Sequence, residues 1–260
     1  MTTSSSRETI VTTAPTPTAV SASPTVSFAD RGSPPDTDVI DRLASIVPGS
    51  STDEVRRRRP ETRLNAQRSY LALFEPEVPG TVTALERFTV AAFVSGLHTD
   101  GALTDFYSGS LARLELGSST NAAILAASYA EATRGATSGP YGHYSQAPLA
   151  LENTDGVHYR VADDHHGVLG TRLVAALEHA HLLVFRPRES SRAALDVLLA
   201  AGWSTTDIVT LSQLVAFLSF QVRVVSGLRI LAASTTASPA THPTTAVSAP
   251  ADANLETSTR

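Results

Sequence analysis

One stretch near the end of the chain constrains its fold more than any other. Apolar residues recur there at alternating spacings of three and four over almost three heptads: Ile208, Leu211, Val215, Leu218, Val222 and Val225. This spacing keeps one face of a helix apolar. Ser204 and Asp207 precede it with the layout of a capping box, in which Asp replaces the usual Glu. The pattern predicts a long helix with a buried face.

Helical spacing recurs in the rest of the chain, whereas strand patterns are weak. We expect further helices over 38–47, 61–74, 81–98, 103–116, 121–132, 164–185 and 191–201. Residues 134–160 are rich in Gly and Pro and have no clear period, so they predict a long loop. Both ends are mostly Ser, Thr, Pro and Ala, which predicts disordered tails at 1–35 and 234–260. The chain is therefore expected to be all-α, with one helical domain over 36–233.

The apolar length of 214–233 raises the alternative of a membrane span. Gln221, Arg223 and Arg229 lie inside it, and each central arginine costs roughly 2.5–3.5 kcal/mol on insertion scales. We therefore expect a buried helix and no membrane partner. The first twenty residues lack the charged start and apolar run of a signal peptide, which predicts a cytoplasmic protein.

Composition limits the chemistry. The chain has no Cys, and all 20 of its Lys and Arg residues are Arg. The lack of Cys excludes thiolate chemistry, and the lack of Lys excludes a Schiff base or a P-loop lysine. A net charge of −5 argues against a nucleic-acid partner. Catalysis would have to come from His, carboxylates, Tyr, Arg or hydroxyl groups.

Two blocks of the chain resemble a known family. The stretch 182–228 is similar to the C-terminal half of carboxymuconolactone decarboxylase (CMD) and alkylhydroperoxidase-D-like proteins, closest to their peroxidase-related branch. The residues that carry the similarity are Arg186-Pro187, the turn at 202–208 and the segment 217–223. The stretch 85–107 resembles the helix pair that carries the active site of that family. The resemblance implies an alkylhydroperoxidase-D-like helical bundle that forms a homo-oligomer.

The peroxidase motif of that family is absent. It consists of Glu, eleven residues, Cys, two residues, Cys, three residues and His. Aligned through the segment 94–97, it places Phe88, Asp100, Leu103 and Tyr107 on these four positions. Thiol peroxidase chemistry by this chain alone is thereby excluded. The decarboxylase branch of the family is expected to use acid–base groups instead of cysteines, but its usual carboxylate-and-His pattern after the first helix is not recognisable here either.

The resemblance indicates which residues could react. His98, Asp100 and Tyr107 lie where the family keeps its reactive groups. Asp100 would orient His98 as a base, and Tyr107 would act as the acid across the pocket. The alternative is that 98–101 is only a polar turn between two helices, with Tyr107 packed beside it.

Three polar residues of the last apolar helix are candidates for substrate binding. Gln213, Gln221 and Arg223 need partners there, because an unsatisfied buried polar group costs on the order of 1–3 kcal/mol. They could line a pocket in which Arg223 binds an anionic small molecule. Alternatively, they bridge helices or subunits.

Two other polar clusters favour ordinary structural roles. The run 163–166 with Glu178, His179 and His181 suggests a metal site, but its spacing scatters the side chains over different helix faces. The basic run 56–59 is flanked by acids and is typical of a salt-bridged surface. We expect no metal and no cofactor.

Two functions of different classes therefore remain. In the first, the chain carries out cysteine-independent acid–base chemistry on a small molecule, such as decarboxylation of a lactone or keto acid. In the second, it is a non-catalytic partner subunit of a cysteine-bearing CMD-family peroxidase. The degenerate motif favours the second function, whereas the polar residues of the last helix allow the first.

Overall fold

A computed structural model of the protein describes residues 38–114 and 118–236. The helices in this part of the chain, in order, are α1 Val39–Leu43, α2 Ser51–Arg57, α3 Pro60–Phe74, α4 Ala84–Leu97, α5 Gly101–Ala112, α6 Ser118–Gly135, η2 Ala147–Glu152, α7 Asp163–Phe185, η3 Pro187–Glu189, α8 Arg192–Ala200 and α9 Thr205–Thr236. The described residues form no strand, so the predicted all-α class is confirmed. The predicted tails lie outside the described residues, except that α9 includes 234–236.

The first predicted helix is wrong in extent. Helix α1 ends at Leu43, because Ala44 caps it and Ser45 has a positive φ of 55°. A second short helix, α2, follows and ends within the basic run, at Arg57; the sequence did not predict it. Its Arg56 is buried and pairs with Asp38 at 2.6 Å and Asp41 at 2.7 Å. These ion pairs join α2 to α1.

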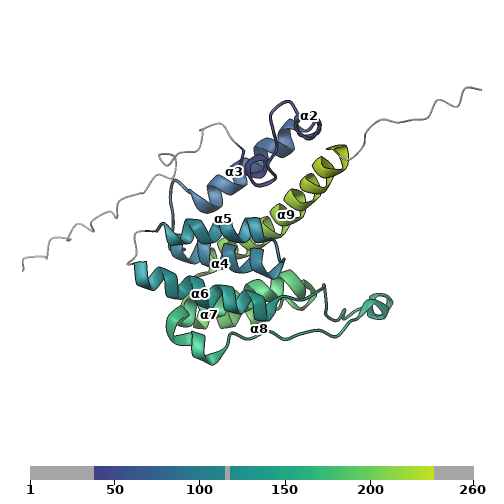
Figure 1. Ribbon diagram of the computed structural model, residues 1–260. Coiled ribbons are helices and arrows are strands. Elements are labelled where there is room, and N and C mark those ends of the chain that lie inside the picture. Colours follow the sequence, from purple (N-terminus) through teal and green to yellow (C-terminus); the bar gives the residue numbers. More distant parts are fainter. Residues whose placement is uncertain (1–37, 115–117, 237–260) are drawn as a thin grey trace, which may run out of the picture. The chain divides into compact units, whose positions relative to one another are not determined.

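Helix α4 lies at the centre of the bundle and packs against α5, α6, α7 and α9 (Figure 1). Its sequence is apolar on nearly every side, which is typical of a helix that is covered all round. Phe88, Phe93 and Leu97 are almost completely buried. A capping box holds its start: Thr83 Oγ1 accepts from the Glu86 amide, and the Glu86 carboxylate accepts from the Thr83 amide.

Two helices are long and apolar enough to cross a membrane by length and composition alone: α7, and α9 over Thr205–Ser234. About half of each apolar window is buried inside the bundle, 56% and 50% respectively. The core helix of a bundle can have the same length and composition. The absence of a membrane partner stays a prediction.

The far end of α9 is attached to the start of the described chain. Arg229 donates from Nη2 to the Leu43 carbonyl at 2.7 Å, and its Nη1 lies 3.2 Å from both carboxylate oxygens of Asp100. One side chain thus ties α9 to the end of α1 and to the start of α5.

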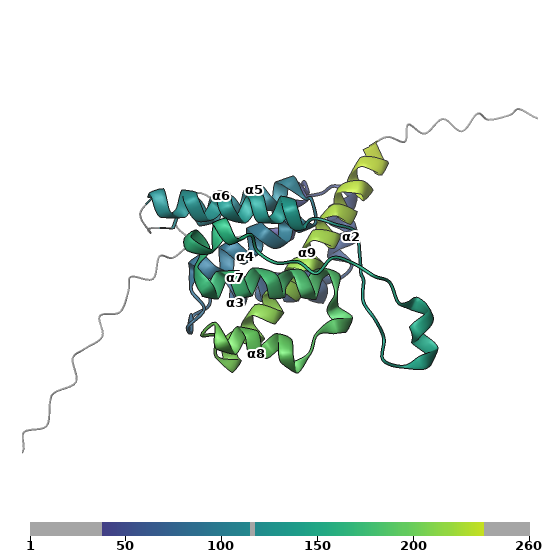
Figure 2. The same ribbon diagram turned by 90° about the horizontal axis from the view of Figure 1, so that it is seen from below.

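The predicted loop between α6 and α7 forms an arm that extends away from the helices (Figure 2). Its tip is the short helix η2, none of whose residues is buried. A single bridge between Gly142 and Thr154 and a hydrogen bond from the Tyr144 amide to Asn153 Oδ1 (2.6 Å) hold its two sides together. The arm is therefore ordered by contacts near its base.

Candidate functional site

His98 lies at the C-terminal end of α4, where it caps the helix. Its Nε2 is buried and, within the described part of the chain, has no hydrogen-bond partner. Burial lowers the pKa of His98 below its usual 6.5, Arg223 lowers it further, and Asp100 opposes the shift. At neutral pH the imidazole is therefore uncharged and offers one donor and one acceptor.

His98 lines a cavity of about 530 Å³. Helix α9 contributes Arg223 and two serines, Ser212 and Ser219, and the end of α7 contributes apolar wall around Phe185. The segment 137–140 completes the lining. The cavity has the features of a small-molecule site: an apolar wall with a few convergent polar groups.

Arg223 is exposed on α9 at the same cavity. Its Nη1 donates to the Ser219 carbonyl one turn earlier, at 2.8 Å. A guanidinium has five N–H donors in a planar fork that fits a carboxylate, and the structure gives this one no acidic partner within 4 Å among the described residues. The cavity thus brings together two of the predicted site residues, His98 and Arg223.

Asp100 is not hydrogen-bonded to His98 in the described structure. It caps the start of α5, where its Oδ1 accepts from the Leu103 amide at 3.0 Å, and it also pairs with Arg229. Its carboxylate still affects His98 through space. The position of Asp100 is that of a helix cap and an interhelical ion pair.

Tyr107 is fully buried in the core and does not line the His98 cavity. Its hydroxyl donates to Gln221 Oε1 at 2.6 Å, and its ring stacks on Phe74 with centroids 5.0 Å apart. Burial, with a smaller contribution from Tyr70, raises the pKa of Tyr107 well above 10, whereas the bond to Gln221 opposes the shift. Tyr107 and Gln221 bridge α5 and α9, as the structural interpretation of the glutamines expects.

Gln213 faces a different hollow, between α3 and α9, together with Phe217 and Phe220. The three polar residues of α9 therefore lie in three places: a surface groove, the core and the His98 cavity. The eight residues from Gln213 to Gln221 are about 12 Å along the helix, and the two residues from Gln221 to Arg223 turn the side chain by about 200°. They do not form one binding site.

No family model matches the chain, and no curated protein matches it. The resemblance to CMD-like proteins therefore rests on the two sequence blocks alone.

The positions of the absent peroxidase motif lie in or beside an aromatic core. Phe88 stacks on Phe74 with ring centroids 5.3 Å apart. Tyr107 stacks on the same Phe74 ring, with centroids 5.0 Å apart. Leu103 is fully buried beside them in α5. Three of the four positions aligned with that motif thus hold a ring or an aliphatic side chain, and the fourth, Asp100, caps α5.

A second polar centre was not predicted from the sequence. Glu131 of α6 is fully buried and accepts from the Tyr159 hydroxyl (2.5 Å), His165 Nδ1 (2.7 Å), the Ala162 amide (3.0 Å) and Arg134. Burial alone would raise its pKa, but these hydrogen bonds lower the pKa to about 2. The centre attaches the arm and the start of α7 to α6. A single acid in an Ala-rich helix carries no sequence signal for such a role.

The residues considered for a metal site are separated by this arrangement. Among 38–114 and 118–236, no three His, Asp or Glu side chains form a group that could hold a metal ion. His165 bonds Glu131, and His181 Nε2 lies 3.0 Å from the Gly135 carbonyl.

Proposed function

We propose that the His98–Arg223 cavity binds a small carboxylate and that the chain performs cysteine-independent acid–base chemistry on it. One observation carries this proposal. His98, whose buried Nε2 has no hydrogen-bond partner among the described residues, and the cationic Arg223 line the same cavity. The CMD-like fold, the homo-oligomer and the cytoplasmic location belong to the proposal as expectations from the sequence.

The chemistry suits decarboxylation of a keto acid or lactone acid. Arg223 holds the carboxylate through charge-assisted hydrogen bonds, and the neutral His98 donates to the neighbouring carbonyl oxygen. In a β-keto acid, the bond between the carboxylate carbon and the α-carbon breaks, CO₂ leaves, and the electron pair of that bond forms an enolate with the adjacent carbonyl. A proton from solvent, passed through the imidazole, completes the product.

Binding is tested first, by calorimetry on the full chain with benzoate and its neutral methyl ester. Arg223→Gln should weaken benzoate binding by about tenfold or more, because it removes the positive charge. Arg68→Gln is the matched control, since Arg68 is an exposed arginine of α3 outside the cavity. Equal benzoate affinity in the two variants would overturn the site.

The pH dependence of binding tests His98 directly. Its pKa lies below 6.5, so its protonation adds a second positive charge to the cavity only on the acid side of that value. Benzoate affinity should therefore rise as the pH falls below 6.5, and His98→Gln should abolish the rise. The chemical step is tested separately by CO₂ release from acetoacetate. Arg223→Gln and His98→Gln should both reduce the rate of this release.

A second function is favoured by the placement of Tyr107. Because its hydroxyl bonds Gln221 in the core, the three predicted catalytic groups do not share one cavity. This supports the alternative of a non-catalytic subunit that binds a cysteine-bearing CMD-family peroxidase. Co-elution of the two purified proteins, without CO₂ release by this chain, is the result that alternative requires.

A further inference from the structure

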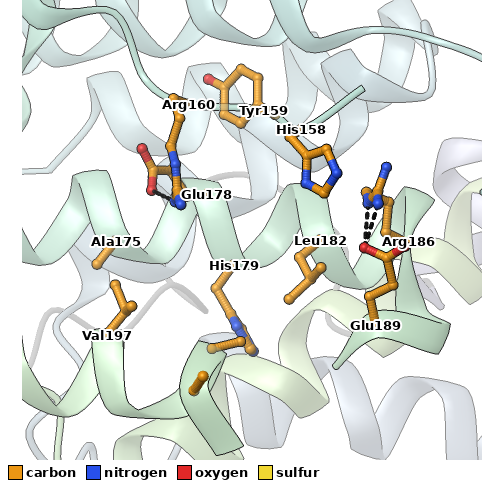
Figure 3. Close-up of a pocket in the computed structure, with 12 residues that line it drawn as sticks. His158, Tyr159, Arg160, Ala175, Glu178, His179, Leu182, Arg186, Glu189 and Val197 are labelled. Carbon is orange, nitrogen blue, oxygen red and sulfur yellow. Dashed lines mark hydrogen bonds and ion pairs between the residues drawn. The ribbon is translucent and has the colours of Figure 1, made fainter. Parts of the chain in front are cut away.

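A second cavity, of about 330 Å³, lies between the segment 158–160, α7 and α8 (Figure 3). It uses different α7 residues from the first cavity: Leu182 and Arg186 line this one, whereas Leu183 and Phe185 line the other. Its volume is at the lower end of the range for small-molecule sites. It is therefore a separate site for a compact ligand.

His179 projects from α7 toward α8 at this cavity (Figure 3). The residue is only 4% exposed, and neither ring nitrogen has a hydrogen-bond partner in the described part of the chain. Buried polar atoms without partners are rare, because each forfeits the hydrogen bonds it made to water. A ligand that bonds the ring would satisfy it.

The charged residues around the cavity neutralise one another. Arg160 pairs with Glu178 at 2.6 Å, and Arg186 Nε pairs with Glu189 at 2.8 Å. Arg186 also donates to the Gly156 carbonyl at 2.7 Å. An ionic ligand would thus lose its hydration without gaining an unpaired opposite charge.

The rest of the lining is mostly aliphatic, from Ala175, Leu182, Ala193, Ala194 and Val197. His158 and Tyr159 complete it, and the Tyr159 hydroxyl already donates to Glu131. Burial lowers the pKa of His179, so its ring is neutral at pH 7 and can both donate and accept one hydrogen bond. The walls favour an apolar body, and the ring favours one polar group on it.

We propose that this cavity binds a small neutral molecule with an apolar body and a single hydroxyl group, which hydrogen-bonds His179. Phenols and cyclic alcohols are the class that fits the cavity. The site is separate from the carboxylate cavity, so an experiment can reject one of the two proposals without rejecting the other.

The first test compares phenol with toluene and benzoate by ligand-observed NMR titration of the full chain. The three differ in the group on one ring: a hydroxyl, a methyl and a charged carboxylate. Phenol should bind about tenfold more tightly than toluene, which is the contribution of one hydrogen bond at the upper end of its usual range. Equal affinity of phenol and toluene, or no phenol binding, overturns the proposal.

Variants locate the binding. Ala194→Leu fills the cavity and should abolish phenol binding, whereas Ala200→Leu, an exposed position of the same helix outside the lining, should not. His179→Phe keeps a ring but removes both nitrogens, so the preference for phenol over toluene should disappear. If His179→Phe does not fold, the two alanine variants still decide the question.

To distinguish the two cavities, benzoate and phenol are each tested on the variants of both cavities. Arg223→Gln should weaken benzoate binding and leave phenol binding unchanged. Ala194→Leu should abolish phenol binding and leave benzoate binding unchanged. Loss of phenol binding in Arg223→Gln would place phenol in the first cavity and overturn the second site.

Discussion

Glu131 contributes to stability in a way that depends on pH. Its pKa in the folded chain is about 2, lowered from the ordinary 4.5. A lowered carboxyl pKa stabilises the fold above the unfolded value, and this contribution is lost as the pH falls through the folded value. The loss should therefore occur between about pH 4.5 and pH 2.

Glu131→Gln should lower the free energy of unfolding at pH 7 by about 1–3 kcal/mol, because Arg134 and His165 lose their charged partner. The difference from the unmodified chain should shrink as the pH falls toward 2. Urea denaturation at several pH values measures both effects. A difference that stays constant with pH would show that the charge of Glu131 does not stabilise the fold.

Tyr107 offers a second residue-scale prediction. Tyr107→Phe leaves the side-chain oxygen of Gln221 without its donor, in addition to the Nε2 that already lacks a partner. We expect a loss of about 1–3 kcal/mol in unfolding free energy. Adding Gln221→Leu should recover part of it, because the double variant leaves no polar group unpaired. Additive losses in the double variant would contradict this account.

The sequence indicated the candidate residues of the site better than it indicated which residues they contact. His98 and Arg223 do share a cavity, and apolar context around the glutamines correctly indicated that Gln221 needs a partner. The partner itself, Tyr107, depends on the rotation of α5 relative to α9, which no local pattern carries. The separation of Gln213 from Arg223 has a different origin, because ten residues along α9 place them about 15 Å apart along the helix axis.

At the scale of elements, the cap of α4 should matter to the whole fold. Thr83→Ala removes the hydroxyl that accepts from the Glu86 amide, and an N-cap loss of this kind costs about 1 kcal/mol. Because α4 is the central helix, the loss should appear in global unfolding by urea. Thr83→Ser keeps the acceptor and should behave like the unmodified chain.

Among the helices with apolar periodicity, α3 and α7 were predicted to within one residue, whereas the charged helix α2 was missed. Helix α3 begins at Pro60 and ends at Phe74, within one residue of the predicted range. Helix α2 was missed because its sequence is charged, and its stability comes from the pairing of Arg56 with Asp38 and Asp41 rather than from an apolar face. Interactions between distant charges leave no periodic signal.

At the scale of the whole molecule, the arm between α6 and α7 should be the first site of proteolysis within 38–236. Leu151 is 94% exposed in a segment without buried residues. A protease that cuts after Leu should cleave there, and the two fragments should stay together because α4 packs against both α6 and α7. Size-exclusion chromatography of the cut protein checks this. Separation of the fragments would contradict it.

The contacts of Arg229 have a consequence for the order in which the helices follow one another along the chain. Because it joins the end of α1 to α9, the first and last described helices are neighbours in space. A circularly permuted chain, with a linker from 236 to 38 that spans the last two turns of α9 and new termini at the tip of the arm, should keep every helix–helix contact of the bundle. The order in which the helices are synthesised is thereby separable from the way in which they pack.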